Sequence, residues 1–299
     1  MEKNLIHQQK RLPSWLRKNK NLNALRETKK SLRKASLSTV CEEARCPNIC
    51  ECFAKPTATF LILGDICTRH CRFCSVKKGV PSQINSDEPS ILAQAAFDLR
   101  LDHVVITSVS RDDLPDGGAG QFAETINAVR TKLPRATIEV LTPDFGGNED
   151  HLRTVIDARP DVFNHNVETT ARLHSTLRPE ASLSRSLEIL RKAKTMSDNI
   201  LIKSGFMVGL GESEAEIIEL LSALEHARCD IVTIGQYMQP SKQQVGVVTY
   251  WMPVQFDRWA DLAKTLGIRY VVSGPLVRSS YHAKEALEET RTHEKEHHP

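Results

Sequence analysis

The sequence predicts an α/β protein built as a partial (β/α)6 barrel, TIM-like but open. Beyond Pro89, short β-branched and apolar runs alternate with amphipathic stretches, an order typical of parallel strands joined by crossover helices. Six such units fall between residues 57 and 277, fewer than a closed barrel of this type requires. With 299 residues and 40% hydrophobic content, the chain is long enough for one large domain.

The individual elements follow from periodicity and from turn residues. The first strand is the run ATFLILGDI, which ends just before Cys67. Later strands are expected at 103–109, 137–141, 161–167, 201–210 and 230–237, with a further one at 270–277. Helices are expected at 90–101, 120–133, 150–158, 182–196, 213–227 and 254–266. The helix from Ser213 begins with a capping box that Glu216 completes.

Composition and charge limit the classes of partner. A net charge of +3 is too mild to indicate nucleic-acid binding. No stretch is apolar enough to cross a bilayer, and Met1 to Ala35 lacks the apolar core of a secretory signal, so we expect no membrane and a cytoplasmic location. Residues 1–34 carry eleven Lys or Arg. They fit a solvated basic arm, a docking strip for an acidic protein or a mitochondrial presequence.

Seven of the eight cysteines lie between Cys41 and Cys74, a clustering that favours a metal site over disulfides. Three of them, Cys67, Cys71 and Cys74, have the spacing C-x3-C-x2-C directly after the first strand, where active sites of such barrels gather. Zinc prefers four closed ligands, and His70 is more plausible as a bystander than as the fourth. Three thiolates suit a 4Fe–4S cluster with one open iron.

The stretch CTRHCRFC resembles the signature of radical S-adenosylmethionine enzymes. The resemblance implies that the open iron binds the methionine part of S-adenosylmethionine. It also implies that an electron from the cluster cleaves S-adenosylmethionine and so releases a 5′-deoxyadenosyl radical. No residue is then expected to act as a classical acid or base. Gly205, Met207, Gly209 and Glu212 in SGFMVGLGE match the family's G-x-I-x-G-x-x-E pattern, with Met for Ile, which implies close approach to the adenine. Ordinary turn glycines are the alternative.

A second set, Cys41, Cys46 and Cys52, has the spacing C-x4-C-x5-C and is similar to the auxiliary-cluster motif of the lipoyl synthase family. Three more passages agree, TSVSRDDLPDGGA, IGQYMQPS and RSSYHA, and the match spans most of residues 12–283. The resemblance implies a second 4Fe–4S cluster with Ser280 as its fourth ligand. It also implies a division into an N-terminal arm and auxiliary-cluster segment (1–56), the barrel (57–277) and a C-terminal ligand segment, lid and polar tail (278–299).

The same resemblance implies a substrate and partners. The substrate is an octanoyl group on a lysine of a carrier, either a lipoyl domain of a 2-oxo acid dehydrogenase complex or the glycine-cleavage H protein. Sulfur is inserted at C6 and C8, and the auxiliary cluster is consumed as the donor. An electron donor of the flavodoxin or ferredoxin type and an iron–sulfur carrier are implied as further partners.

Polar residues at the expected strand ends are candidate contacts for S-adenosylmethionine. Those after the second strand would bind its amino group: Ser108, Arg111 and Asp112. Those after the fourth would bind ribose and carboxylate: Asn164, Asn166, Glu168 and Arg178. At the sixth strand end, Gln236, Tyr237 and Gln239 would line the substrate side. Solvated turns explain the first group equally well.

The remaining features leave alternatives open. Few apolar residues surround Cys41 to Cys52, so we expect an irregular segment there, with Cys50 as a spare thiol. Cys229 precedes a buried strand and is expected in the core. Arg278, Ser279 and Tyr281 could form only a hydrogen-bonded lid. Three other functions compete: a different radical enzyme that inserts sulfur, a zinc-binding module and a simple electron carrier.

Overall fold

The structure is a computed structural model that describes residues 12–17, 37–52, 59–280, 283–285, 287 and 289. Apart from 12–17, the basic arm therefore lies outside the described residues, as does Tyr281. Among the residues that are described, no helix combines the length and apolar character needed to span a lipid bilayer.

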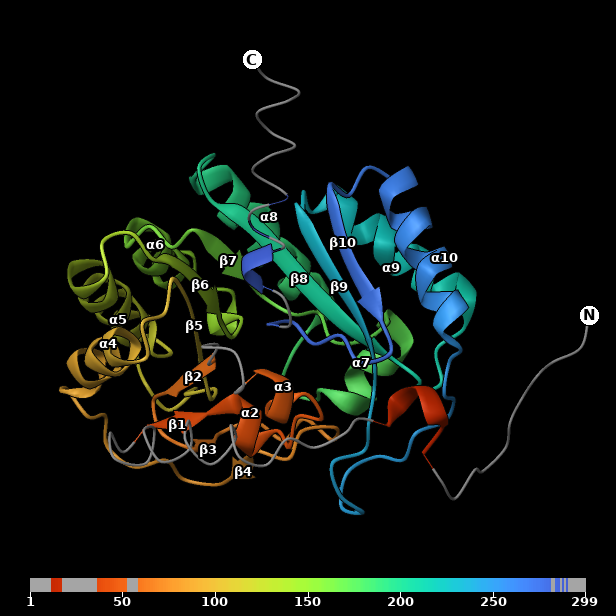
Figure 1. Ribbon diagram of the computed structural model, residues 1–299, viewed down its shortest axis with the longest axis horizontal. Coiled ribbons are helices and arrows are strands. Elements are labelled where there is room, and N and C mark those ends of the chain that lie inside the picture. Colours follow the sequence, from red (N-terminus) through yellow and green to blue (C-terminus); the bar gives the residue numbers. More distant parts are fainter. Residues whose placement is uncertain are drawn as a thin grey trace, which may run out of the picture.

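One eight-stranded sheet forms the centre of the molecule (Figure 1). Its strands follow one another in the order β1 (Ser38–Thr39), β2 (Thr59–Ile62), β5 (His103–Ser108), β6 (Thr137–Leu141), β7 (Val162–Asn164), β8 (Leu201–Val208), β9 (Ile231–Gln236) and β10 (Tyr270–Gly274). All neighbours are parallel except β1, which is antiparallel to β2. No pairing between β1 and β10 closes the sheet within the described part of the chain. The predicted open, partial barrel is confirmed.

One main helix follows each of the first six parallel strands and covers the outside of the sheet (Figure 1). These are α4 (Glu88–Asp98), α5 (Ala119–Lys132), α6 (Glu149–Asp157), α8 (Leu183–Met196), α9 (Glu214–His226) and α10 (Pro253–Thr265). The capping box of α9 is confirmed: the Ser213 hydroxyl accepts from the Glu216 N–H at 3.3 Å, and the Glu216 carboxylate accepts from the Ser213 N–H at 2.8 Å. These six helices follow one another along the chain in the predicted order.

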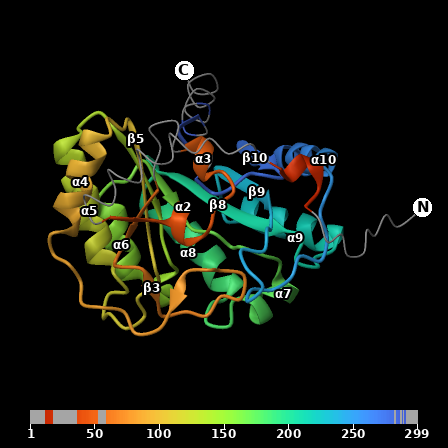
Figure 2. The same ribbon diagram turned by 60° about the horizontal axis from the view of Figure 1, so that its bottom comes forward.

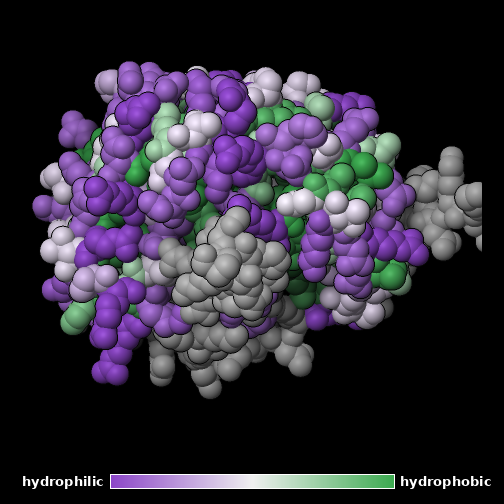
Figure 3. All heavy atoms as spheres, turned by 90° about the horizontal axis from the view of Figure 1, so that it is seen from above, coloured by the Kyte–Doolittle hydropathy of each residue, from purple (hydrophilic) through white to green (hydrophobic). Residues whose placement is uncertain are grey.

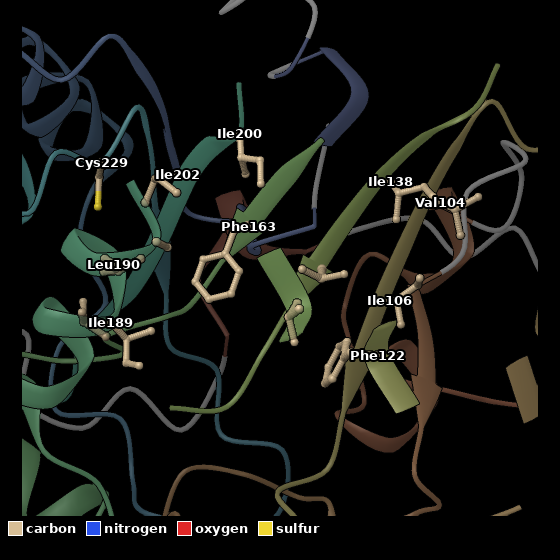
Figure 4. Packing of buried hydrophobic residues seen from close by; sticks show 14 of the residues in the cluster. Val104, Ile106, Phe122, Ile138, Phe163, Ile189, Leu190, Ile200, Ile202 and Cys229 are labelled. Carbon is tan, nitrogen blue, oxygen red and sulfur yellow. The ribbon is translucent and has the colours of Figure 1, made fainter. Parts of the chain in front are cut away.

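Alternate residues along the strands point into the layer between sheet and helices. Figure 4 shows Val104 and Ile106 of β5, Phe163 of β7 and Ile202 of β8 in this layer, with Leu190 of α8 against them. Cys229 lies in the same cluster and is 5% exposed, and burial raises the pKa of its thiol. The expectation that Cys229 is a core residue is confirmed. The other strand residues, which alternate with those in this layer, face the inner side of the sheet.

Several elements differ from the prediction. The strand expected at 161–167 is only β7, because beyond Asn164 the regular pairing stops and the chain keeps an isolated bridge to β8 between Glu168 and Phe206. The strand expected at 270–277 ends at Gly274, before Pro275. Elements too short for a periodic signal were missed. They are η1 (Ser14–Leu16), η2 (Phe145–Gly147), α7 (Ala171–Leu177) and the ribbon of β3 (Ile66–Cys67) with β4 (Lys77–Lys78).

The first cysteine segment is not irregular, contrary to the prediction. It contains two single-turn helices, α2 (Val40–Glu43) and α3 (Ile49–Cys52). In Figure 2 both lie over the middle of the sheet. Cys41, Ile49 and Cys52 pack against the main hydrophobic cluster, and these contacts supply the apolar burial that the local sequence lacks.

A further view of the molecule, Figure 3, shows a mostly hydrophilic face with small hydrophobic groups.

Candidate active site

A cavity of about 190 Å³ opens on the inner face of the sheet. Its strand residues lie mostly toward the carboxyl ends of β6, β8 and β9, and it is closed by α2, by the turn before α3 and by the chain after β10. The lining consists of Val40, Cys41, Ala44, Cys46, Asn48, Cys52, Thr59, Leu141, Asn166, Glu168, Gly205, Phe206, Met207, Thr233, Gly235, Val277, Arg278, Ser279 and Ser280. Segments more than two hundred residues apart in the sequence therefore share one wall.

The three upstream cysteines and Ser280 all line this cavity. The pKa of the Cys41 thiol is raised to about 12, mainly by burial and in smaller part by the neighbouring Cys46 and Cys52. Arg278 is close to Cys46, which raises the pKa of its guanidinium. Burial has the larger effect and lowers that pKa overall. The arrangement gathers three thiols, the Ser280 hydroxyl and the Arg278 guanidinium, and Ser279 lines the cavity beside them.

Cys50 is separate from this group, although it lies between two of the cavity cysteines in the sequence. Its side chain is 9% exposed and does not line the cavity. It is the buried residue of α3. The structure therefore agrees with a spare thiol, and it gives no sign of an alternative ligand register.

Asn166 and Glu168, just after β7, also line the cavity. Glu168 has a φ of 69°, a left-handed conformation that is uncommon for a residue with a side chain. It is held there by the Glu168 N–H donating to Gly205 at 3.0 Å and by the Met207 N–H donating to its carbonyl at 2.9 Å. Burial raises the pKa of the Glu168 carboxyl, and nearby Arg178 opposes that shift. Half-buried polar residues in strained conformations of this kind concentrate at functional sites.

The pattern G-x-M-x-G-x-x-E divides between cavity and framework. Gly205 and Met207 line the cavity, whereas Gly209 does not. Gly209 has a φ of 100°, and an added Cβ would lie 2.5 Å from the Thr249 carbonyl. The Glu212 carboxylate accepts the Leu210 N–H at 2.9 Å and the Trp251 indole N–H at 3.1 Å. Gly209 and Glu212 therefore belong to the turn that follows β8, the strand that contains Gly205 and Met207.

In the second cysteine trio, Cys67 is the last residue of β3, and Cys71 and Cys74 lie in the loop between β3 and β4. Burial raises the pKa of Cys71 and of Cys74, while Arg178 beside Cys71 and Lys78 beside both oppose it. Cys67 is close enough to Cys74 to raise its pKa as well. The loop thiols do not line the cavity described above, so the two trios are distinct sites.

Arg69 connects this loop to the sheet. Its guanidinium donates to Asp112 at 2.7 and 2.8 Å and to Asp144 at 2.6 Å. The Asp112 carboxylate also accepts from Thr68. These contacts hold the pKa of Asp112 below its ordinary value, with Arg69 as the main cause. Arg69 thus ties the cysteine loop to the ends of β5 and β6.

The residues predicted to bind S-adenosylmethionine are not all at the cavity. Arg111 is turned away, because it donates to Asp113 at 2.9 Å and to the Leu63 carbonyl at 3.2 Å. Asn164 is fully buried in the sheet, where it donates to Glu139 at 3.0 Å within an ion pair that includes Lys203. Asp112 is engaged by Arg69, as described above. Asn166, Glu168, Gly205 and Met207 are at the cavity.

Four predicted residues carry buried side-chain atoms that have no hydrogen-bond partner among the described residues: Ser108 Oγ, Asn164 Oδ1, Asn166 Oδ1 and Arg178 Nε. Arg178 otherwise donates to the Asn166 and Val167 carbonyls at 3.1 and 3.3 Å. Buried polar atoms without partners are costly unless another group satisfies them. Those of Ser108, Asn166 and Arg178 fit a polar ligand at the strand ends, whereas that of Asn164 lies beside the buried pair of Glu139 and Lys203.

The cysteine trios fit clusters better than single ions. Within the described residues, no three or more His, Cys, Asp or Glu side chains are gathered tightly enough to hold one metal ion. In an iron–sulfur cluster each thiolate binds a different iron, so the sulfur atoms lie further apart than they do around one zinc ion. The donor chemistry, all thiolate with one hydroxyl, also agrees.

The residues predicted to line the substrate side instead make hydrogen bonds that support the neighbouring backbone. Gln236 donates to the Val208 and Thr249 carbonyls at 3.1 and 2.9 Å, and it accepts from the Trp251 N–H at 2.9 Å. Tyr237 donates to the Val245 carbonyl at 2.8 Å. Neither these two nor Gln239 lines the cavity. They hold the loop after β9 in place.

Sequence reasoning missed other lining residues, chiefly Asn48, Thr233, Gly235 and Val277. One signal was available, because a glycine inside an apolar strand marks close approach of another backbone. The apolar lining could not be separated from ordinary core residues by sequence alone.

Comparison with known proteins agrees with this geometry. Residues 61–224 match the family model described as the radical SAM superfamily. The chain therefore belongs to the radical S-adenosylmethionine superfamily, a membership that implies a 4Fe–4S cluster and S-adenosylmethionine as cofactors.

The curated relatives narrow this class. A lipoyl synthase of Caldanaerobacter subterraneus subsp. tengcongensis is 53% identical over 277 residues, covering 93% of this chain and 97% of the relative. A lipoyl synthase of Rubrobacter xylanophilus is 51% identical, with coverage of 93% and 87%. The chain belongs to the lipoyl synthase family.

Solved structures at low identity support the fold alone. The FeFe-hydrogenase maturase HydG from Carboxydothermus hydrogenoformans has a TM-score of 0.59 at 14% identity, covering 89% of this chain and 67% of that one. Streptococcus suis SuiB bound to S-adenosylmethionine has a TM-score of 0.56 at 10% identity, covering 79% and 57%. Both likenesses extend over most of this chain, as expected for a shared barrel.

Proposed function

We propose that this chain converts a protein-bound octanoyl-lysine to lipoyl-lysine by inserting sulfur at C6 and C8. The observation that carries the proposal is the shared cavity, in which Cys41, Cys46, Cys52 and Ser280 face the strand-end residues Glu168 and Met207. A group activated at the strand ends would therefore be next to the sulfur source. The family membership agrees with this reaction.

The cofactors would be two 4Fe–4S clusters and S-adenosylmethionine, which together supply an electron, a 5′-deoxyadenosyl radical that removes hydrogen from carbon, and sulfide. Cys67, Cys71 and Cys74 would hold the first cluster. Cys41, Cys46, Cys52 and Ser280 would hold the second. A hydroxyl is a poorer iron ligand than a thiolate, which favours release of the iron atom that Ser280 would bind when the cluster is dismantled.

The cavity lining suits an alkyl chain. Val40, Ala44, Leu141, Phe206 and Val277 give much of the wall an apolar character, which favours an octanoyl group and disfavours water. Excluding water protects a carbon radical from side reactions, and the role of the protein is orientation rather than proton transfer.

Polar groups at the strand ends would orient S-adenosylmethionine. Asn166 and Arg178 have unpartnered buried atoms that a ribose hydroxyl or a carboxylate would satisfy, and Ser108 has a third. Gly205 lets the neighbouring strand pack closely at the cavity wall, because an added Cβ would lie 2.1 Å from the Thr233 hydroxyl. Arg111 and Asn164 are assigned to the framework instead.

The proposed carriers are lipoyl domains of 2-oxo acid dehydrogenase complexes or the glycine-cleavage H protein. An electron donor of the flavodoxin or ferredoxin type, an iron–sulfur carrier and a cytoplasmic location remain predictions.

The test separates the two cysteine sets in anaerobically reconstituted protein. Replacing Cys67, Cys71 and Cys74 by Ala should abolish deoxyadenosine formation from S-adenosylmethionine. Replacing Cys41, Cys46 and Cys52 by Ala should keep deoxyadenosine formation and abolish sulfur transfer to an octanoylated carrier. The proposal fails if the second triple variant still transfers sulfur.

A further inference from the structure

The segment Gly274–Ser280, called here the 274–280 segment, crosses the inner face of the sheet directly after β10. It begins with a tight turn, in which the Val277 N–H donates to the Gly274 carbonyl at 3.0 Å. Pro275 occupies the second position of this turn, where its fixed φ is favourable. The turn reverses the chain, and its last four residues then line the cavity.

Gly235 of β9 makes room for this return. It is paired with Gly274 in the parallel register of β9 and β10. A Cβ on Gly235 would lie 2.2 Å from the Val277 carbonyl oxygen and 3.1 Å from its carbonyl carbon. The backbone of Val277 therefore occupies the space that a side chain on β9 would need, and any residue larger than glycine must displace it.

Asn48 holds the same segment from the other side. Its side chain is 1% exposed, and its Nδ2 donates to the Leu276 carbonyl at 2.6 Å. The main-chain carbonyl of Asn48 accepts from the Glu51 and Cys52 N–H groups at 2.9 and 3.0 Å, which begins α3. One residue thus joins the turn that carries Cys52 to a segment 228 residues away.

We propose that Gly235 and Asn48 are positioning residues, which fix the 274–280 segment against the upstream cysteines and so bring Ser280 to Cys41, Cys46 and Cys52. This inference rests on the proposed function, because it takes the four side chains as ligands of one cluster. A weak hydroxyl ligand depends on placement more than a thiolate does. Neither residue takes part in the reaction; both act through Ser280.

Three alanine variants form a graded test. Gly235→Ala meets a backbone carbonyl at 2.2 Å, Gly274→Ala meets only the Val277 side chain at 3.3 Å, and Gly246→Ala meets nothing within 4 Å. None of the three glycines has the positive φ that would disfavour alanine by itself. Gly246→Ala is therefore the matched control. Asn48→Asp keeps the size of the side chain but replaces the donor with an acceptor.

The first readout is hydrogen–deuterium exchange of the reconstituted protein, followed in peptides that span 274–280. Gly235→Ala should speed exchange there by about tenfold or more, because overpacking forces the backbone to move. Gly246→Ala should leave it unchanged, and Gly274→Ala should fall between. Ser280→Ala should leave exchange unchanged, since it removes the ligand and not the contacts that hold the segment.

The second readout is the iron held by the upstream site, counted in a background with Cys67, Cys71 and Cys74 replaced by Ala. Gly235→Ala and Asn48→Asp should lose this iron, whereas Gly246→Ala should keep it. If Gly235→Ala does not fold, Asn48→Asp carries both readouts. The inference is overturned if exchange and iron match the wild type in the variants that fold, or if Gly246→Ala shows the same losses.

These readouts do not require sulfur transfer. If the wild type fails to modify an octanoylated carrier, the proposed function fails, while exchange and iron content still decide whether Gly235 and Asn48 position the segment.

Discussion

Arg69 donates a hydrogen bond of 2.6 Å to Asp144, which is fully buried. Arg69 lies two residues after Cys67, the last residue of β3, and Asp144 lies beyond the end of β6. The pair therefore connects the β3–β4 loop, which is proposed to hold a cluster, to the strand ends at which S-adenosylmethionine is expected. The Arg69 side chain is 5% exposed, so the pair is shielded from solvent.

We expect Arg69→Ala to destabilise the fold by about 3 kcal/mol, because removing one partner leaves a buried carboxylate poorly compensated. Arg185 remains near Asp144 at 3.3 Å and limits the loss. Urea unfolding measures the change. The matched control is Arg153→Ala, which removes an exposed pair with Glu149 and should cost at most about 0.5 kcal/mol. Equal losses in the two variants would contradict the role given to Arg69.

His165 should make stability depend on pH. Burial lowers the pKa of its imidazole from 6.5 to about 4. The neutral ring is satisfied on both sides, with Nδ1 donating to the Thr142 carbonyl at 2.8 Å and Nε2 paired with the Ser186 hydroxyl at 2.9 Å. The unfolded chain takes up a proton below about pH 6.5 and the folded chain only near pH 4. This stability is therefore complete above pH 6.5 and is lost as the pH falls toward 4.

Between pH 7 and pH 5, His165 should account for about 2 kcal/mol of lost unfolding free energy. His165→Asn should reduce the pH-dependent loss by that amount, whatever its effect at pH 7. Urea unfolding at the two pH values measures it. His226→Asn, which changes a side chain that is 78% exposed, serves as the control. An unchanged pH dependence in His165→Asn would rule out this origin.

Ser280→Ala should separate the two halves of the reaction. Ser280 lines the cavity with the upstream cysteines, so its loss should lower sulfur transfer by about tenfold or more, as loss of groups that support metal sites does. Deoxyadenosine formation should persist. Ser279→Ala changes the neighbouring cavity hydroxyl and is the control, with a smaller effect expected. Parallel loss of both activities in Ser280→Ala would indicate a folding defect instead.

Cys50→Ala should keep both clusters. Because Cys50 is 9% exposed and outside the cavity, we expect unchanged iron content and a stability cost of about 1 kcal/mol. Cys46→Ala should lose the iron of the upstream site. Iron analysis of reconstituted protein compares them, and loss of iron in Cys50→Ala would make that residue a ligand.

The order of strands and helices could be predicted because each long element carries its own periodicity. Ile217, Leu220, Leu221 and Leu224 of α9 are buried, as their spacing indicates. The seven residues of α7 are too few for such a pattern. The helices α2 and α3 form in a polar stretch because the barrel buries their apolar side chains, and no local feature records that contact.

The candidate site was predictable where motifs carry it. Cys41, Cys46, Cys52 and Ser280 meet at one cavity, but their spacing alone gave no distance between them. Arg111 and Asn164 were chosen because they lie near strand ends, and the structure assigns both to buried contacts that a linear sequence does not reveal. Asn48 escaped notice because its partner is 228 residues away.

The most direct measurement is the intact mass of an octanoylated carrier after one round with reductant, S-adenosylmethionine and protein reconstituted with ³⁴S-labelled sulfide. We expect the carrier, in its oxidised form, to gain two sulfur atoms and lose two hydrogens, and both sulfurs should carry the label. A carrier of unchanged mass despite deoxyadenosine formation would contradict the proposed substrate, and unlabelled sulfur in the product would contradict the cavity cysteines as holders of the sulfur donor.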